Sequence, residues 1–482
     1  MTRPGVGLTY VPGLDDILHE VADLLDVVEI EPQSLWRVRG DGEISVDEDV
    51  LERLADLPGT RLLHGVGNPV GGSCLPDPRH AALFGELAGR LRAPWVSEHL
   101  AFNRVADGRD GFHTGFMLPP CQTEAGVSAA ARSIRTMADA LPVPLAVEIG
   151  ANYLRPRPQD LSDGAFVRRV VEDSGCGLLL DLHNVLANER NGRGTVDDLL
   201  AELPLDQVWE VHLAGGSEYR GYWLDAHSGL PDDELLALAD RILPRLPALR
   251  AVLFEVTPSA VPDLDAGAVR ELLVAMRELW PAQAHPAPLS PPGPADVPRT
   301  AGVPRPAGGE TTAPSDWEFT LGSLAVGRDP GTPLAQELMT DPAIGLLRDL
   351  VAEFRGSALT GTLRYTMRLL FLTLGPVGTG QLLSGYTRSC PPRLFASEEA
   401  FAFADHLREV SPPVPWLTDV VELDLGLLRA RLDGSPCTVC LRTDPTALLT
   451  DLGAGRLPIA PPRGHYRVRL VDDGAPAWTA PA

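Results

Sequence analysis

The sequence predicts an α/β fold: a (β/α)8 TIM barrel over residues 1–280, then a linker, then a mostly helical second domain with some β structure at its end. Three observations lead to this prediction. Short apolar runs alternate with helical patterns through the first 280 residues, the composition changes abruptly at residue 281, and helical periodicity returns after residue 316. A chain of 482 residues also exceeds the size of one typical domain.

Eight short runs rich in valine, leucine and isoleucine are the candidate strands. In chain order they read VGLTY, DVVEIEP, TRLLHGVG, APWVSEHL, LAVEIG, GLLLDLHN, QVWEVHLAG and RAVLFEVTP. Runs that are apolar on both faces are typical of buried parallel strands. Helical patterns between them span Leu14–Leu25, Arg79–Leu91, Glu124–Ala140, Asp163–Ser174, Thr195–Leu203, Asp232–Leu246 and Ala266–Leu279. Strands that each precede a helix or helical turn predict a TIM barrel, whose chemistry lies at the carboxyl ends of the strands.

The rest of the chain divides at residue 317. Residues 281–316 are dominated by proline, alanine and glycine and predict a disordered, semi-extended linker. Residues 317–482 form the predicted second domain, with helices at Pro333–Met339, Ala343–Glu353, Leu363–Leu374, Gly378–Thr387, Ser397–Arg408 and Trp416–Leu432. Two strand-like runs, PCTVCLRT and HYRVRLVDD, end this domain. It carries no cluster of metal-ligand residues, so we expect a binding or packing module.

Metal-ligand residue types recur at the ends of the candidate strands in the barrel. The candidates are His64, His99, Glu148, Asp181, His183, His212, Asp225, His227 and Glu255. A lone histidine at a strand end is more often an ordinary hydrogen-bonding group, so the grouping carries the prediction. Imidazole and carboxylate groups gathered at one end of a barrel predict a multinuclear site for a hard or borderline metal.

Glycines stand close to these candidates, at residues 65, 67, 71, 72, 215 and 216. A residue without a side chain lets another backbone approach closely, as a bound peptide would require. Ordinary turns are the alternative explanation.

Composition narrows the function further. The chain carries 65 acidic and 41 basic residues, a formal net charge of −24, which argues against a nucleic-acid partner. This charge suits metal cations or a basic peptide, or serves solubility alone. Six scattered cysteines predict no disulfide framework, and the single Cys437-Thr-Val-Cys440 pair is weak evidence for a zinc or redox site. We expect a cytoplasmic protein without a membrane segment, because no signal architecture or long apolar stretch is present.

Several ordered motifs over residues 4–280 resemble one enzyme family. LHGVGNPVGGS, VSEHLAF, GFMLPP, VEIGANYL, LLLDLHNVLAN, VHLAG, LDAHSG and FEVTP are similar to motifs of the multinuclear non-heme iron-dependent oxidative enzymes. That family includes the catalytic subunit of methanobactin oxazolone synthase and an enzyme of thiaglutamate biosynthesis. The resemblance implies a TIM barrel that uses two or three iron ions, in mixed Fe(II)/Fe(III) states, and O2 to oxidise cysteine in ribosomally made precursor peptides.

The resemblance also implies an allocation of ligands. His64, His99 and Glu148 would hold one iron, and Asp181, His212 and Glu255 a second, with Glu148 shared between them. His183, Asp225 and His227 would complete a more labile third site.

The second domain has a resemblance of its own. GQLLSGYTRSCPPRLFASEEAFAFADHLRE and PVPWLTDVVELDLGLL are similar to the small partner proteins that are normally encoded beside these enzymes. Such partners present the precursor peptide to the barrel. The resemblance therefore implies a fusion of enzyme and partner, in which the second domain binds the leader segment of a cysteine-containing peptide.

Departures from the family pattern concern the residues around the metal. Val28–Leu35 reads VEIEPQSL where the family commonly has EVHAENY, so Glu29 keeps its place but the positions that follow differ. Glu148–Tyr153 reads EIGANY in place of ENISSY. These changes leave the reaction open. The alternatives are a divalent-metal sugar isomerase or a phosphoesterase on the same barrel, or a non-catalytic metal or peptide carrier.

Overall fold

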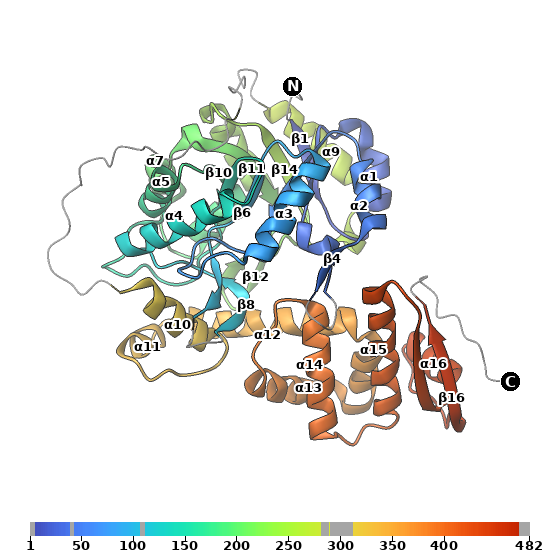
Figure 1. Cartoon of the computed structure of the whole chain (residues 1–482). Helices are drawn as coiled ribbons and strands as arrows, with labels where there is room; N and C mark the ends of the chain where they lie inside the picture. The colour runs from blue at the N-terminus through green and yellow to red at the C-terminus, as the bar shows by residue number, and fades with distance from the viewer. Residues whose placement is uncertain (1–4, 39–42, 107–110, 281–288, 290–311, 472–482) are drawn as a thin grey trace.

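The fold class predicted from the sequence is confirmed. A computed structural model describes residues 5–38, 43–106, 111–280, 289 and 312–471 (Figure 1). Eight parallel strands close into a barrel in the order β1-β14-β11-β10-β9-β6-β5-β2. These are β1 (Val6–Tyr10), β2 (Val27–Ile30), β5 (Thr60–Gly65), β6 (Val96–His99), β9 (Leu145–Glu148), β10 (Gly177–Asp181), β11 (Val208–Ala214) and β14 (Ala251–Glu255). Each one matches a predicted apolar run.

Helices surround the barrel in the positions that the sequence predicts. They are α1 (Asp15–Val21), α3 (Pro78–Leu91), α4 (Glu124–Ala138), α5 (Asp163–Ser174), α7 (Val196–Glu202), α8 (Asp233–Ile242) and α9 (Ala266–Leu279), with 3-10 turns at Ala22–Leu24, Pro32–Leu35, Leu205–Gln207, Leu243–Arg245 and Val261–Asp263. Two further helices, α2 (Glu48–Ala55) and α6 (Leu182–Arg190), were not predicted. Residues 182–188 of α6 are all buried, including the polar residues His183, Asn184 and Asn188, so this helix lacks the exposed polar face of an amphipathic helix.

The two ends of the barrel interior differ in character. Trp95, Trp209 and Ala251 lie close to the starts of their strands and pack in an apolar cluster with Val27 and Leu62. The charged candidates lie at the opposite, carboxyl ends. The apolar cluster therefore fills the lower barrel and leaves the upper rim for polar groups.

Three short hairpins follow barrel strands at this carboxyl end, and none was predicted. They are β3–β4 (Trp36–Val38 and Ile44–Val46), β7–β8 (Phe102–Val105 and Phe112–Leu118) and β12–β13 (Ser217–Tyr219 and Tyr222–Leu224). They follow β2, β6 and β11 respectively, so they extend the rim around the candidate residues.

The second part of the chain is helical with a final hairpin, as predicted. Its elements are α10 (Pro314–Ala325), α11 (Pro333–Leu338), α12 (Ala343–Thr362), α13 (Arg364–Ser389), α14 (Ala396–Val410), α15 (Leu417–Asp433), β15 (Cys437–Thr443), α16 (Pro445–Gly453) and β16 (Arg463–Leu470). Helix α13 joins two predicted helices. The break between them lies at Gly375, which has a φ of 66° and is followed by Pro376.

The C-terminal boundary of the predicted linker differs from the structure. Most of residues 281–316 lie outside the described residues, but α10 already begins at Pro314. Proline at the first position of a helix is favourable, because its missing N–H has no partner there in any case. The boundary at residue 317 would therefore cut α10, and the domain division stays a prediction.

Helix α10 joins the second part of the chain to the barrel rim. Trp317 and Leu321 are buried in one apolar cluster with Phe102 and Leu118 of the β7–β8 hairpin. The indole Nε1 of Trp317 donates to the carbonyl of Pro119 over 2.9 Å. Helices α10 and α12 consequently lie against the carboxyl-end side of the barrel (Figure 1).

A second contact ties α10 to the loop that follows β5. The backbone N–H of Ser73 donates to the Glu318 carboxylate over 2.6 Å, and the Ser73 hydroxyl donates to its other oxygen over 2.5 Å. Glu318 is buried in this contact. Loss of α10 would therefore expose both apolar and polar groups of the rim.

The Cys437–Cys440 pair does not form a joint site. Both cysteines are free. Cys437 is half-buried, whereas Cys440 is exposed on the solvent face of β15. Residues three apart on a strand point to opposite faces of the sheet, so the two thiols do not converge. Among the described residues, no helix is long and apolar enough to cross a membrane.

Candidate metal centre

Six of the nine candidates lie at or near the carboxyl ends of barrel strands. The strand register places His99 beside Glu148, Asp181 beside His212, and Ala214 beside Glu255. The other three lie just beyond the strands: His183 on α6, and Asp225 and His227 in the segment after β13. Neighbouring strands of the barrel thus bring residues that are far apart in the sequence into one rim.

His64, His99 and Glu148 form the first cluster. The Nε2 atoms of His64 and His99 lie 3.0 and 3.2 Å from the same oxygen, Oε2 of Glu148. The other ring nitrogens are held from outside, since His64 Nδ1 lies 2.8 Å from Ser97 Oγ and His99 Nδ1 lies 2.9 Å from the Gly65 carbonyl. Such outer contacts fix the ring orientation of metal-binding histidines. Both Nε2 lone pairs can therefore serve a metal that Glu148 also binds.

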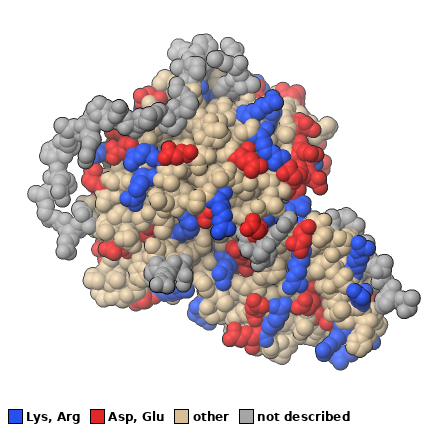
Figure 2. Space-filling model, viewed as in Figure 1, with Lys and Arg blue, Asp and Glu red and all other residues tan. Residues whose placement is uncertain are grey.

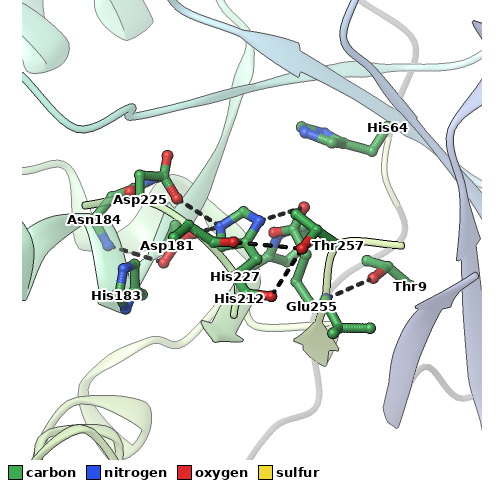
Figure 3. A network of polar contacts seen from close by, with 12 residues as sticks. Thr9, His64, Asp181, His183, Asn184, His212, Asp225, His227, Glu255 and Thr257 are labelled. Atoms are coloured by element: carbon green, nitrogen blue, oxygen red, sulfur yellow. Dashed lines mark hydrogen bonds and ion pairs between the residues drawn. The ribbon is translucent and has the colours of Figure 1, made fainter. Parts of the chain in front are cut away.

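Asp181, His227 and Glu255 form a second cluster, which Asp225 adjoins. Figure 3 shows the His227 ring between Asp225 and Glu255. Its Nε2 lies 2.7 Å from Asp225 Oδ1 and 3.6 Å from Asp181 Oδ2, and its Nδ1 lies 3.5 Å from Glu255 Oε1. His227 has a φ of 43°, a left-handed conformation that is unfavourable for a residue with a side chain. Backbone strain of this kind concentrates at functional sites.

His212 connects the second cluster to a deeper pair of carboxylates. Its Nδ1 lies 2.7 Å from Glu255 Oε2, and its Nε2 lies 3.2 Å from Glu29 Oε1 and 3.7 Å from Glu210 Oε1. Glu210 also accepts a hydrogen bond from Trp95 Nε1 over 2.9 Å. Glu29, Glu210 and His212 form a third group with metal-site geometry, and all three are buried.

Glu29 and Glu210 were absent from the predicted ligands. A signal for Glu210 was present in the sequence, because it stands two residues before His212. Alternate residues of a barrel strand face the same side, so both point into the interior. Glu29 stands in the corresponding apolar strand β2, but only the closed barrel shows that β2 faces β11 across the interior.

The arrangement differs in part from the allocation that the resemblance implies. Asp181 and Glu255 are grouped with His227, while His212 faces the other oxygen of Glu255. His183 lies in none of the three clusters: its Nε2 lies 3.1 Å from the Leu224 carbonyl, and its ring centroid lies 6.1 Å from that of His227. Which residues bind a metal therefore stays a prediction.

Asn184 links the first two clusters. Its side-chain amide donates to Glu148 Oε1 over 3.2 Å, and its backbone N–H donates to Asp181 Oδ1 over 3.1 Å. The latter bond caps α6, because Asp181 is both the last residue of β10 and the N-cap of that helix. Each carboxylate keeps one oxygen free to face its cluster.

Several buried atoms of the clusters fit a metal. The following atoms make no hydrogen bond among the described residues, and apart from Glu29 Oε2 each is held only by the ion pairs described above: His64 Nε2, Glu148 Oε2, Asp181 Oδ2, Asp225 Oδ1, His227 Nε2, His212 Nε2, Glu29 Oε1 and Oε2, and Glu210 Oε1. Buried polar atoms are normally paired, and unpaired ones are costly. This donor set of imidazole nitrogen and carboxylate oxygen suits Fe, Mn and Zn rather than a thiolate-seeking metal.

The buried carboxylates at the rim favour bound positive charge, carried either by protons or by metal ions. Burial works against the charged form of His99, but the Glu148 and Glu98 carboxylates outweigh it and raise its pKa to about 10. Burial would likewise raise the pKa of Glu255, yet the imidazoles of His227 and His212 hold it well below its usual range. Protons and metal ions compete for the same lone pairs, so metal binding should release protons and should weaken as the pH falls.

The deeper carboxylate pair behaves differently. Burial, and then the charge of nearby Glu210, raises the pKa of Glu29 to about 7. Glu29 and Glu210 both lie near one imidazole. Their positive partner is His212, whose pKa is raised well above its usual value because Glu29 and Glu255 outweigh the effect of burial.

A pocket lies beside the first two clusters. His99 and Asp225 contribute one wall, and Phe116, Leu118 and Tyr153 contribute apolar surface. The Tyr153 hydroxyl accepts a hydrogen bond from the Asp225 N–H over 3.0 Å. An apolar pocket that reaches candidate ligands is suited to a substrate side chain.

Nearby glycines have explanations within the protein. A Cβ on Gly65 would lie 2.3 Å from Glu98 Oε2, and one on Gly71 would lie 2.8 Å from the Leu100–Ala101 backbone. A Cβ on Gly215 would lie 2.6 Å from the carbonyl oxygen of Gly229. Close packing of the loops around the rim therefore accounts for these three positions without a bound peptide.

Comparisons with known proteins show which family the barrel part of the chain resembles. A family model described as RiPP precursor modification enzyme MbnB/TglH/ChrH matches residues 5–276. A UPF0276 protein of Chromobacterium violaceum is 29% identical over 275 residues, which are 56% of this chain and 98% of that protein. A UPF0276 protein of Streptomyces avermitilis is 31% identical over 249 residues, which are 49% of this chain and 48% of that protein.

Solved structures are similar to just over half of the chain. D-psicose 3-epimerase of Clostridium cellulolyticum H10, solved with D-tagatose, covers 57% of this chain and 96% of its own, with a TM-score of 0.37 and 11% identity.

Proposed function

Because the chain belongs to the MbnB/TglH/ChrH family of RiPP precursor modification enzymes, we propose that it is an iron- and O2-dependent enzyme that oxidises cysteine in a ribosomally synthesised precursor peptide. The observation that carries the proposal is the pair of clusters at the barrel rim, His64–His99–Glu148 and Asp181–His227–Glu255, which lie side by side and are linked by Asn184.

Iron suits this donor set, and when bound it would supply redox chemistry and open positions for O2 and a cysteine thiolate. His64, His99 and Glu148 would hold one ion. Asp181, His227 and Glu255 would hold another, with Asp225 and His212 at the edge of that site. Neither cluster contains a thiol, and Cys121 and Cys176 are buried elsewhere in the fold.

The protein's own residues would prepare the substrate. The pocket beside His99 and Asp225 would hold the peptide near the clusters and exclude water through Phe116 and Leu118. Ser97 and the Gly65 carbonyl would hold the two imidazoles in place during turnover. Glu29 and Glu210 would balance the charge on His212.

We further propose that the second part of the chain holds the leader segment of the peptide. Helices α10 and α12 lie against the rim that carries the candidate ligands, so a peptide bound there would stay close to the pocket. Covalent connection replaces a bimolecular encounter by an effective concentration near the millimolar range for a short flexible tether.

The full-length protein, purified without oxygen and supplied with ferrous iron, provides the test. Short cysteine-bearing peptides encoded beside its gene are added, and O2 uptake is followed together with the peptide mass. We expect uptake and a mass change with the cysteine peptide, and neither with its Cys→Ser counterpart. Equal uptake with both peptides would overturn the assignment. Isomerisation of a sugar or cleavage of a phosphate ester without O2 would favour the alternative barrel chemistries instead.

A further inference from the structure

The outer face of the C-terminal hairpin is strongly basic. Along β16 the exposed positions alternate with covered ones, and they hold Arg463, His465, Arg467 and Arg469. On β15, Arg442 is exposed. Figure 2 shows blue side chains gathered at the lower right of the molecule, where this hairpin lies.

The strand register places these groups on one surface. Arg469 lies opposite Thr438, and Arg467 lies opposite the exposed Cys440. Opposite residues of an antiparallel pair share a face. Arg442 is exposed two positions after Cys440, at a register irregularity between Leu441 and Thr443. We call Arg442, Arg467 and Arg469 the arginine face. Like charges this close repel one another unless an anion lies between them.

The arginine face has no acidic partner among the residues that the structure describes. None of its three side chains makes an ion pair with a described residue, whereas exposed arginines elsewhere, such as Arg241 and Arg270, pair with Asp197 and Asp23. All 41 basic residues of the chain are arginines, and acidic residues number 65. In a chain with this excess of carboxylates, an unpaired cationic surface points to an anionic partner from outside.

The opposite face of the hairpin fixes it in place. Val439, Leu441, Val468 and Leu470 are buried in one apolar cluster with Leu423 of α15 and Leu449 of α16. No described helix covers the outer face, since its residues stay exposed. The arginine face is therefore carried on strands that are packed on their other side, and it is open to solvent.

We propose that the arginine face binds an acidic, extended segment of the precursor peptide. This inference rests on the proposed function, because it names the chemistry by which the leader is held. In an extended strand, side chains at alternate positions share one face, which matches the alternation of Arg467 and Arg469 on β16. Guanidinium groups bind carboxylates through two parallel hydrogen bonds, so arginine favours acidic partners of defined orientation.

A peptide fits this surface better than a nucleic acid or a membrane. The net charge of −24 repels a long polyanion from the rest of the molecule. Bound single strands usually stack on exposed aromatic rings, whereas Tyr466 of β16 points toward the covered side. The outer face also lacks the apolar side chains that insert into a lipid surface.

The position of the hairpin agrees with an anchoring role. In Figure 1, β16 and α16 lie at the end of the second part of the chain, away from the barrel. An acidic segment bound there would itself remain unmodified, while the connected part of the peptide extends toward the rim. Charged residues of the leader would thus select the substrate at a distance from the chemistry.

Binding to the full-length protein tests this inference. The probe is a fluorescein-labelled peptide of alternating glutamate and serine, about as long as β16, and its binding is followed by fluorescence polarisation. The triple variant Arg442→Gln/Arg467→Gln/Arg469→Gln should bind it about tenfold more weakly or worse, since exposed charge pairs contribute modestly and add up. Added salt should weaken binding to the wild type but not to this variant.

A matched variant removes the same charge elsewhere. Arg169→Gln/Arg241→Gln/Arg270→Gln changes three exposed, paired arginines on barrel helices and should bind the probe like the wild type. Equal losses of probe binding in both variants would show that net charge alone causes the effect, and this result would overturn the proposal. So would a glutamine–serine peptide that binds equally well, or a single-stranded RNA that binds more tightly than the acidic probe. The assay needs no turnover, so O2 uptake without acidic-peptide binding would refute the arginine face alone.

Discussion

Replacing Glu148 with glutamine should abolish turnover and lower the iron content of the protein. Glu148 Oε2 is the one atom that both His64 Nε2 and His99 Nε2 face, within 3.2 Å. Glutamine keeps the size of the side chain but removes the negative charge that a shared metal ligand supplies. Outer residues typically change metal affinity or activity by about 10–100-fold, so a direct ligand should cost more than about a hundredfold.

Two further variants provide reference values against which the effect of Glu148→Gln is compared. Ser97→Ala removes the outer contact of His64 and should fall within the range expected for an outer residue. His183→Ala should have a smaller effect than either, because His183 lies in none of the clusters. Iron is measured by metal analysis and turnover by O2 uptake. Full activity in Glu148→Gln would refute the site, and an effect as mild as that of Ser97→Ala would make Glu148 an outer residue.

Replacing Arg355 with methionine should destabilise the second part of the chain by about 3–5 kcal/mol, the usual cost of removing one partner of a buried ion pair. Arg355 and Glu399 are 4% and 3% exposed, and their charged atoms lie 2.6 Å apart. Arg355 also stacks on Tyr386 at 4.6 Å. The variant would leave the Glu399 carboxylate buried without its cation.

Urea unfolding, followed separately for the two parts of the chain, checks this result. Arg355→Met/Glu399→Leu should recover most of the loss, because an apolar pair of similar size often replaces a buried ion pair. Arg408→Met breaks an exposed pair with Glu422 and should cost about 1 kcal/mol or less. A loss in Arg355→Met no larger than that in Arg408→Met would contradict the buried-pair account.

The barrel was predictable from the sequence because its strands are locally encoded. Runs such as LAVEIG are apolar on both faces and short, and each became a strand of the closed barrel. Helix α6 was missed because residues 182–188 are all buried, and its polar residues His183, Asn184 and Asn188 form no solvent-exposed face. Hydrophobic periodicity detects amphipathic elements, and short apolar runs indicate buried strands. A short helix that is buried on all sides fits neither pattern.

Most residues of the site were predictable from the sequence, but their arrangement was not. Residues such as His212 and Glu255 stand at strand ends, and the carboxyl rim of a barrel necessarily gathers them. Which of them face each other depends on the order of strands around the barrel, so the pairing of His227 with Asp181 and the role of Glu29 required the closed fold. The docking of α10 on the rim, through Trp317 and Glu318, is a contact between distant segments that no local pattern encodes.

The central claim is that the barrel rim binds iron, and metal analysis of the protein purified without oxygen tests it most directly. Expression in medium that contains both iron and zinc lets the site choose between two metals that suit its nitrogen and oxygen ligands. The account predicts about two to three irons per chain, as the family resemblance implies, with magnetically coupled ferric pairs visible by Mössbauer spectroscopy and lost in Glu148→Gln. Stoichiometric zinc without iron under these conditions would contradict it.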